Sequence, residues 1–294
     1  MAAMSFARPV SPRRLPNASC RASRAYLCSM SHPPPTSPAP SPIAGLQVPA
    51  HALVTGASSG IGLAVVEALL QHPGMARVVA VSRSAEHSPA LAALASRHGQ
   101  RLLRVSADVT AAEGRARIAA RCGPGPLHLL FNAAGMLHGP DLAPEKSLAS
   151  LDADALASVF ALNAFAPILL VQALAAQLPR DQPLVLAALS ARVGSIGDNR
   201  LGGWYAYRAS KAALNQLLRT LAVEWRRSHP QATCVLLHPG TVDTPLSRPF
   251  QARVPAAQLF TPQHAASQLL GIVAGLTPAD SGNFLAWDGS AIPW

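Results

Sequence analysis

The first 66 residues of this 294-residue chain contain no acidic residue, and Glu67 is the first. Lysine is nearly absent, because 22 of the 24 basic residues are arginine and the two lysines are Lys146 and Lys211. Aromatic residues make up only 5% of the chain, and the arginines beyond residue 45 are scattered. This pattern excludes a surface of interleaved basic and aromatic side chains, so we expect no nucleic-acid partner.

Cysteine and long hydrophobic runs are also scarce. No C-x-x-C pair and no Cys/His cluster has metal-ligand spacing, so we expect no metal site, no structural disulfide and a reducing compartment. The four cysteines are Cys20, Cys28, Cys122 and Cys234. The longest apolar helical stretch, residues 155–178, is interrupted by Asn163 and Pro167. The sequence therefore predicts no transmembrane helix and no membrane partner.

Residues 1–45 lack the apolar content of a folded segment. They hold five arginines, many serines and a proline-rich run over residues 33–42, which stays extended and solvated. This composition fits an organelle transit peptide followed by a linker. The early prolines favour a chloroplast, whereas Arg24-Ala25-Tyr26 resembles a mitochondrial cleavage context. Without a targeting role the segment is a disordered tail of a cytoplasmic protein, and in either case residues 46–294 form the folded domain.

The stretch over residues 52–62, Ala-Leu-Val-Thr-Gly-Ala-Ser-Ser-Gly-Ile-Gly, joins a short apolar strand to a helical pattern over residues 63–70. Its three glycines are Gly56, Gly60 and Gly62. Such a turn presents backbone N–H groups and a helix N-terminus to a pyrophosphate. Glycine is required where a Cβ atom would collide with the approaching backbone or ligand. The stretch therefore predicts a dinucleotide site.

Strand-like and helical segments alternate along the remaining chain. We expect strands near residues 52–54, 77–82, 101–107, 127–131, 183–189, 232–237 and 283–287. We expect helices near residues 63–70, 89–98, 111–121, 151–178, 204–229 and 262–274. This alternation predicts an α/β fold, a single-domain doubly wound (Rossmann) parallel sheet of about seven strands with helices on both faces.

The end of the second expected strand bears on cofactor choice. An acidic residue there binds the 2′-hydroxyl of NAD, whereas an arginine accommodates the 2′-phosphate of NADP. The strand ends in Ser82-Arg83 without an acid. The sequence therefore favours NADP(H) over NAD(H).

From about residue 50 onward the chain resembles the short-chain dehydrogenase/reductase family. Besides the glycine turn, four motifs follow in the family's order: Asp108-Val109, Asn132-Ala133-Ala134-Gly135, Tyr207-x-x-x-Lys211 and Pro239-Gly240-x-Val242-x-Thr244. The loop over residues 194–199, the run over residues 202–215 and the ending over residues 287–294 further resemble the C-factor and Sniffer-type carbonyl reductases. The resemblance implies a small-molecule carbonyl substrate and a homo-oligomer, either a dimer or a tetramer.

The resemblance also implies the site residues. The cofactor contacts would come from Thr55, Gly56, Ser58, Ser59, Gly60, Ile61, Gly62, Arg83, Asp108, Val109, Asn132, Ala133, Ala134, Gly135, Tyr207, Lys211, Pro239, Gly240, Val242 and Thr244. The catalytic residues would be Asn163, Ser190, Tyr207 and Lys211. In the family an asparagine at the position of Asn163 marks a helix kink and a water link between the lysine and solvent.

Tyr207 and Lys211 are four residues apart on an expected helix, so their side chains share one face. A phenol has a pKa near 10, and a nearby ammonium lowers that pKa. We therefore expect Tyr207 to act as the general acid toward a carbonyl oxygen, with Lys211 tuning it and binding the nicotinamide ribose. Tyr205 is six residues from Lys211 and does not fit this spacing.

One position departs from the family. The family commonly supplies a serine near the end of the fifth strand, 13 residues before the tyrosine and three before a glycine. Ser190 lies 17 residues before Tyr207, and an alternative register with a longer loop puts Ala191, three residues before Gly194, at the serine position. Ser190 and Ser195 flank it, and neighbouring strand residues point to opposite faces. We expect one of these serines to donate to the substrate oxygen, with a preference for Ser190.

Three functions remain open. The first is an NADPH-dependent carbonyl reductase, an oxidoreductase that reduces a carbonyl to an alcohol. The second is a 3-oxoacyl-carrier-protein reductase, for which Arg192, Arg200, Arg248 and Arg253 would form a docking patch. The third is a non-catalytic NAD(P)-binding sensor or signalling protein, which Ala191 favours.

Overall fold

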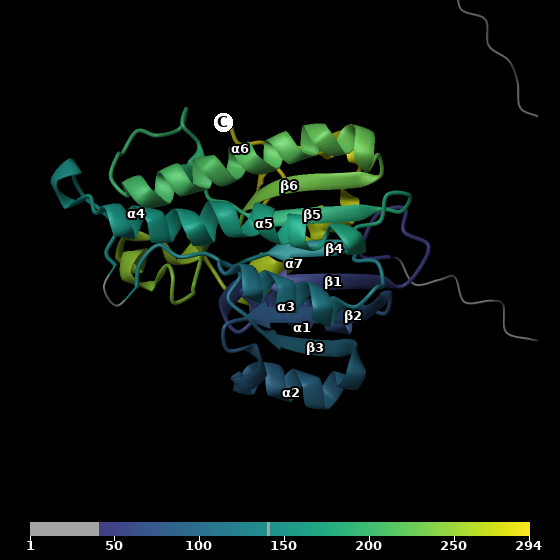
Figure 1. Cartoon of the computed structure of the whole chain (residues 1–294). Coiled ribbons are helices and arrows are strands. Elements are labelled where there is room, and N and C mark those ends of the chain that lie inside the picture. Colours follow the sequence, from purple (N-terminus) through teal and green to yellow (C-terminus); the bar gives the residue numbers. More distant parts are fainter. Residues whose placement is uncertain (1–40, 140–141) are drawn as a thin grey trace, which may run out of the picture. The chain divides into compact units, whose positions relative to one another are not determined.

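The computed structural model describes residues 41–139 and 142–294 (Figure 1). The predicted transit peptide and most of the predicted linker fall on residues 1–40, outside the described residues. Ile43 and Leu46 are buried in the core, at 1% and 5% exposure. The boundary that we predicted at residues 45 and 46 therefore falls inside a packed segment, and folding uses part of the expected linker.

A seven-stranded parallel sheet forms the centre of the fold, in the order β3-β2-β1-β4-β5-β6-β9 (Figure 1). The strands are β1 Ala50–Thr55, β2 Met75–Ser82, β3 Leu102–Ser106, β4 Leu129–Asn132, β5 Leu184–Leu189, β6 Ala232–His238 and β9 Phe284–Ala286. The order reverses between β1 and β4, and in such sheets ligands bind outside the carboxyl ends of the strands at this point. The predicted fold class is confirmed.

Helices cover both faces of the sheet. On one face lie α1 Gly60–Gln71, α2 Pro89–His98 and α7 Pro262–Gly275, and on the other lie α3 Ala112–Cys122, α5 Ala166–Ala173 and α6 Tyr205–Ser228. The alternation of side chains along β1 explains the two layers: Ala52 and Val54 join the first core cluster, whereas Leu53 joins the second. A strand with both faces buried is apolar at nearly every position, as β5 is.

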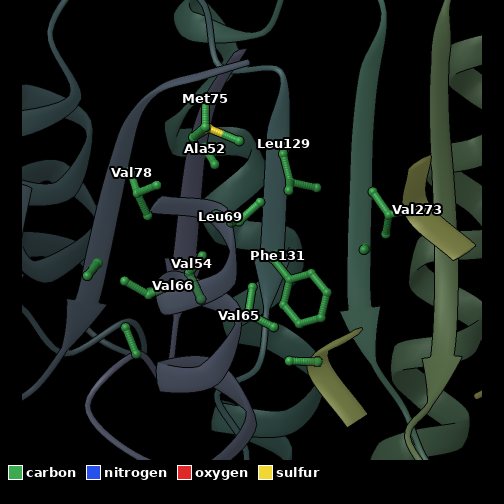
Figure 2. Packing of buried hydrophobic residues seen from close by; sticks show 14 of the residues in the cluster. Ala52, Val54, Val65, Val66, Leu69, Met75, Val78, Leu129, Phe131 and Val273 are labelled. Carbon is green, nitrogen blue, oxygen red and sulfur yellow. The ribbon is translucent and has the colours of Figure 1, made fainter. Parts of the chain in front are cut away.

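Figure 2 shows the packing beneath the glycine turn. Val65, Val66 and Leu69 of α1 lie against β1, and residues from β2, β4 and α7 complete this cluster. The latter are Met75, Val78, Leu129, Phe131 and Val273. Full burial of one such side chain contributes about 1.5–3 kcal/mol. The cluster therefore fixes the direction in which α1 leaves the turn.

The helix expected over residues 151–178 is present over Ala153–Ala173, and it contains a π-helical segment. It consists of α4 Ala153–Phe160, a π-helical segment Ala161–Phe165, and α5 Ala166–Ala173, followed by a 3-10 turn Ala175–Gln177. Asn163 sits in the π-helical segment, where its side-chain amide binds the backbone of Met136. Pro167 has no N–H to donate and occupies the first turn of α5. Asn163 and Pro167 thus lie where the hydrogen-bond pattern of the helix changes.

By length and composition alone, the stretch Ala153–Ala173 would be apolar enough to cross a membrane, with a mean hydropathy of 1.8. In the fold, Leu170 and Val171 are buried in the cluster that α5 shares with α3 and α6. The absence of a membrane partner stays a prediction.

Several short elements were not expected. β7 Thr241–Val242 and β8 Leu259–Phe260 form a separate two-stranded parallel sheet. Further 3-10 turns lie at Ala85–His87, Gly99–Arg101, Leu148–Ser150, Arg192–Gly194, Arg248–Arg253, Ala256–Gln258 and Pro278–Asp280. The turn Arg248–Arg253 belongs to the proline-containing loop that follows Thr244.

Candidate active site

A cavity of about 830 Å³ opens at the carboxyl ends of β1, β2, β4 and β5. Most of the predicted site residues line it: Gly56, Ser58, Ser59, Gly60, Ile61, Gly62, Arg83, Asp108, Val109, Ala133, Ala134, Gly135, Ser190, Tyr207, Lys211, Pro239 and Thr244. The structure thus brings together residues that are up to 188 positions apart in the sequence, from Gly56 to Thr244.

The glycine turn is shaped so that side chains are excluded. Gly56 has a φ of 66°, and a Cβ on it would come within 2.8 Å of the Ala134 backbone nitrogen. A Cβ on Gly62 would overlap the Gly56 carbonyl oxygen. At the start of α1, the Ser59 side chain caps no backbone N–H group of the helix. Open N–H groups at a helix N-terminus beside a Cβ-free turn fit a pyrophosphate.

Thr55 and Asn132 lie behind this cavity rather than in its lining. The Thr55 hydroxyl donates to Asn132 Oδ1 at 2.6 Å and accepts from the Ala134 backbone nitrogen at 3.3 Å. Both side chains are buried, and the bonds tie the end of β1 to the segment after β4. Their contribution is to hold Ala133 and Ala134 against the glycine turn.

Two basic side chains, Arg83 and Arg117, lie near the end of β2. Arg83 is exposed and lines both the main cavity and a smaller one of about 350 Å³, which Asp108 and Arg117 also line. Hydrogen bonds from Thr110 lower the pKa of Asp108, and the charge of Arg83 acts in the same direction. Arg117 donates to the Ser106 carbonyl at 3.2 Å. Sequence reasoning missed Arg117, because no motif marks its position on α3.

Tyr207 and Lys211 lie one turn apart on α6 and are buried, at 9% and 4% exposure. Lys211 Nζ donates to the Leu189 carbonyl at 2.8 Å and lies 5.8 Å from the centre of the Tyr207 ring. Burial raises the pKa of Tyr207 to about 12 and lowers the pKa of Lys211 to about 8. Burial is the cause of both shifts, and the effect of Lys211 on the pKa of Tyr207 stays a prediction.

Asn163 does not line the cavity, but its side chain bonds to the backbone of Met136, which does. Its Oδ1 accepts from the Met136 nitrogen at 2.8 Å, and its Nδ2 donates to the Met136 carbonyl at 2.8 Å and to Ser210 Oγ at 3.1 Å. A Cβ on Gly135 would lie 3.3 Å from Asn163 Oδ1 and 3.5 Å from Lys211 Nζ. Glycine at this position therefore keeps a narrow space open between Asn163 and the lysine.

Ser190 lines the cavity, but its hydroxyl already has a partner. Ser190 Oγ donates to Asn215 Oδ1 on α6 at 2.6 Å, so donation to a substrate would require that bond to break. Ser195 is buried at 1% exposure, accepts from the Asp198 nitrogen, and is not among the described residues that line the cavity. Ala191, between them in the chain, has an extended backbone with φ −148° and ψ 149°. Neither serine thus presents a free hydroxyl proton to the cavity.

Two loops also contribute to the lining of the cavity. His138, Pro245 and Leu246 line it, and His138 Nε2 is within 3.1–3.2 Å of the carbonyl oxygens of Pro245 and Leu246. Gly240 and Val242, which we predicted as cofactor contacts, do not line the cavity. A Cβ on Gly240 would meet the Phe260 ring at 2.8 Å, so this glycine serves the turn after β6.

Comparisons with known proteins show which family this chain resembles. The family model that matches residues 50–254 is described as short chain dehydrogenase. The C-signal protein of Myxococcus xanthus is 34% identical over 171 residues, which cover 58% of this chain and 94% of that protein. An NADPH-bound carbonyl reductase from chicken fatty liver has a TM-score of 0.73 and 31% identity, covering 85% of this chain and all of that one. The carbonyl reductase Sniffer of Drosophila melanogaster has a TM-score of 0.73 and 25% identity, covering 84% of this chain and all of that one.

A parallel doubly wound sheet with a glycine-lined cavity at its switch point is typical of dinucleotide-binding proteins. The chain belongs to the short-chain dehydrogenase/reductase family, whose members bind a nicotinamide cofactor. The resemblance to the C-factor and Sniffer-type group is likewise confirmed.

Proposed function

We propose that this protein is an NADPH-dependent carbonyl reductase in which Tyr207 donates the proton to the carbonyl oxygen. The observation that carries the proposal is the placement of Tyr207 and Lys211. Both are buried on one face of α6 and line the same cavity as the glycine turn and Arg83. The NADPH-bound carbonyl reductase from chicken, which matches 85% of this chain, supports the same assignment.

The chain's own groups fit the reduction direction. Because burial raises the pKa of Tyr207 to about 12, the phenol is protonated at neutral pH and holds a proton to give. With a pKa of about 8, Lys211 is mostly charged at neutral pH and favours the phenolate that forms as the proton leaves. Bound NADPH would supply the hydride. The turn at Gly56 to Gly62 would hold its pyrophosphate, and Lys211 its nicotinamide ribose.

Turnover of NADPH with aldehydes, quinones and 3-oxoacyl thioesters tests the proposal. Tyr207→Phe removes the proton and keeps the ring, so we expect kcat to fall by about 10²–10⁴-fold while NADPH affinity survives. Tyr205→Phe is the matched control, since Tyr205 is 42% exposed and does not line the cavity. Activity confined to the thioesters would indicate the carrier-protein reductase. NADPH binding without turnover of any carbonyl would indicate a sensor.

Arg83 tests the choice of cofactor. The exposed guanidinium of Arg83 lies at the end of β2, where Ser82 and Ser84 flank it in the sequence, and Arg117 provides a second cation in the smaller cavity. We expect Arg83→Ala to weaken NADPH binding by roughly 1.5–3 kcal/mol, the worth of a hydrogen bond to a charged group. Binding of NADH should be nearly unchanged. An equal loss for both cofactors would refute the NADP(H) assignment.

Two further proposals concern the whole protein. We propose that residues 1–45 direct it to a chloroplast or mitochondrion, and that it assembles as a homodimer or homotetramer. A fluorescent protein fused behind residues 1–45 should colocalise with one of these organelles, and a cytoplasmic signal would contradict import. Sedimentation equilibrium of the protein should give two or four times the chain mass of 30.5 kDa.

A further inference from the structure

The helix that carries Tyr207 begins in an unusual way. Its N-cap position is occupied by Trp204, whose φ of 53° lies in the left-handed region, and the Trp204 side chain caps no backbone group. Gly202 and Gly203 before it have φ values of 64°, which glycine adopts freely. A residue with a Cβ is strained in this conformation. Backbone strain of this kind persists only where the surrounding contacts hold the residue in place.

Glu145, on a loop 61 residues upstream, holds the first turn instead. Both of its carboxylate oxygens lie 3.3 Å from the Ala206 backbone nitrogen, and its own carbonyl accepts from the Trp204 nitrogen at 2.6 Å. The residue is only 4% exposed. A carboxylate at a helix N-terminus stabilises the helix by interacting with its dipole. Burial of a carboxylate is unfavourable unless it accepts hydrogen bonds. A Ser or Asp at residue 204 would cap the helix without burying a distant charge.

Because Glu145 caps the helix, residue 204 can carry an aromatic side chain. The Trp204 ring has two aromatic neighbours. The Trp204 ring meets the Phe250 ring edge-on at 4.8 Å and the Tyr207 ring edge-on at 6.3 Å. Phe250 belongs to the 3-10 turn Arg248–Arg253, and its other neighbour is the cavity-lining His138 at 5.9 Å. Trp204 thus connects Tyr207 with the loop on the far side of the cavity.

We propose that Glu145 is the positioning residue of Tyr207. By capping α6 from a separate loop, it fixes the first turn of the helix and leaves residue 204 to the aromatic side chain that packs on Tyr207 and Phe250. This inference rests on the proposed function, since it concerns the placement of the proton donor. Glu145 itself is not among the described residues that line the cavity, so its effect reaches the substrate only through α6.

Kinetics of the full-length protein test the proposal. We expect Glu145→Ala to lower kcat for benzaldehyde about 100-fold, because a small misplacement of a catalytic group has an effect of this size. The Kd for NADPH and the KM should stay within twofold. Glu145→Gln keeps one acceptor oxygen and should recover part of the rate. Glu224→Ala is the matched control, since Glu224 is exposed near the other end of α6, and it should keep the wild-type kcat.

Amide hydrogen exchange separates this inference from the proposed function. In Glu145→Ala the exchange of residues 204–208 should accelerate at least tenfold, while Glu224→Ala exchanges like the wild type. If the wild type turns over no carbonyl, the proposed function fails and the exchange result alone decides whether Glu145 anchors the helix. Wild-type kcat in folded Glu145→Ala, or unchanged exchange, would overturn the inference. Should Glu145→Ala not fold, wild-type kcat and exchange in Glu145→Gln would overturn it equally.

Discussion

At the scale of single residues, Tyr207 and Lys211 have pKa values shifted in opposite directions by the same cause. Burial disfavours a charge, so the pKa of the phenol rises to about 12 and the pKa of the ammonium falls to about 8. The ordinary pKa values of tyrosine and lysine are nearly equal, whereas here the pKa of Tyr207 lies well above that of Lys211. The lysine, and not the tyrosine, is therefore the group that titrates nearest to neutral pH.

The pH dependence of reduction follows from that order. Lys211 is charged below about pH 8 and neutral above it, whereas Tyr207 keeps its proton throughout this range. We expect kcat for carbonyl reduction to be level near neutrality and to fall as the pH rises through about 8. Rates measured from pH 6 to 10 check this. In Lys211→Arg the guanidinium stays charged, so the rate should be lower but without this fall. A wild-type rate that is constant to pH 10 would contradict the assignment.

Ala191 offers a second prediction at this scale. We predicted from the sequence that Ala191 takes the place of the family serine, and the hydroxyl of Ser190 donates to Asn215. We expect Ala191→Ser to raise kcat at least tenfold, because one preorganised donor to a developing oxyanion contributes about 10²–10³ in rate. Ser195→Ala should be silent, since Ser195 does not line the cavity. An unchanged rate in Ala191→Ser would mean that another group already supplies the hydrogen bond.

At the scale of elements, the two helices α1 and α7 each contain a glycine with a different purpose. Gly62 lies in the first turn of α1, where a Cβ would overlap the Gly56 carbonyl, so the close approach of helix and turn depends on it. Gly271 lies in α7 with nothing within 4 Å of its missing Cβ. The same substitution should therefore have opposite effects in the two helices.

We expect Gly62→Ala to push α1 away from the turn, weakening NADPH binding by at least tenfold and lowering the melting temperature. Gly271→Ala removes only backbone freedom from the unfolded chain and should stabilise the protein by about 0.4–1 kcal/mol. Thermal melts and NADPH titrations of both variants provide the measurement. Equal stabilisation by both substitutions would show that the turn tolerates a side chain.

At the scale of the whole molecule, the start of the folded region lies earlier than composition suggests. Ile43 is 1% exposed and belongs to the core cluster that α1 and α7 share. A chain beginning at Ser41 should melt like the full-length protein. One beginning at Gln47 loses Ile43 and Leu46, two buried side chains of about 1.5–3 kcal/mol each, and should melt several degrees lower. Equal melting temperatures for all three chains would show that these contacts add no stability.

Much of the site was predictable from the sequence because its chemistry depends on local spacing. The glycine turn is a strand-to-helix connection of a few residues, and the Tyr207–Lys211 pair is one turn of a single helix. Arg117 of the smaller cavity and His138 of the main cavity were not predictable in this way, since each comes from an element whose position depends on distant packing. The helix expected over residues 151–178 is present, but its π-helical segment was not predictable from periodicity, because the side-chain amide of Asn163 bonds to the backbone of Met136, 27 residues away.

The sequence by itself determined the fold class, the family and the identity of the groups at the glycine turn and on α6. Each of these depends on periodicity, on closely spaced residues or on the order of short motifs along the chain. The tertiary structure decided what those groups can do. It set the pKa order of Tyr207 and Lys211 and committed the Ser190 hydroxyl to Asn215. It also brought Glu145 to the start of α6. Burial and long-range hydrogen bonds cause these effects, and both arise only when segments far apart in the chain are packed together.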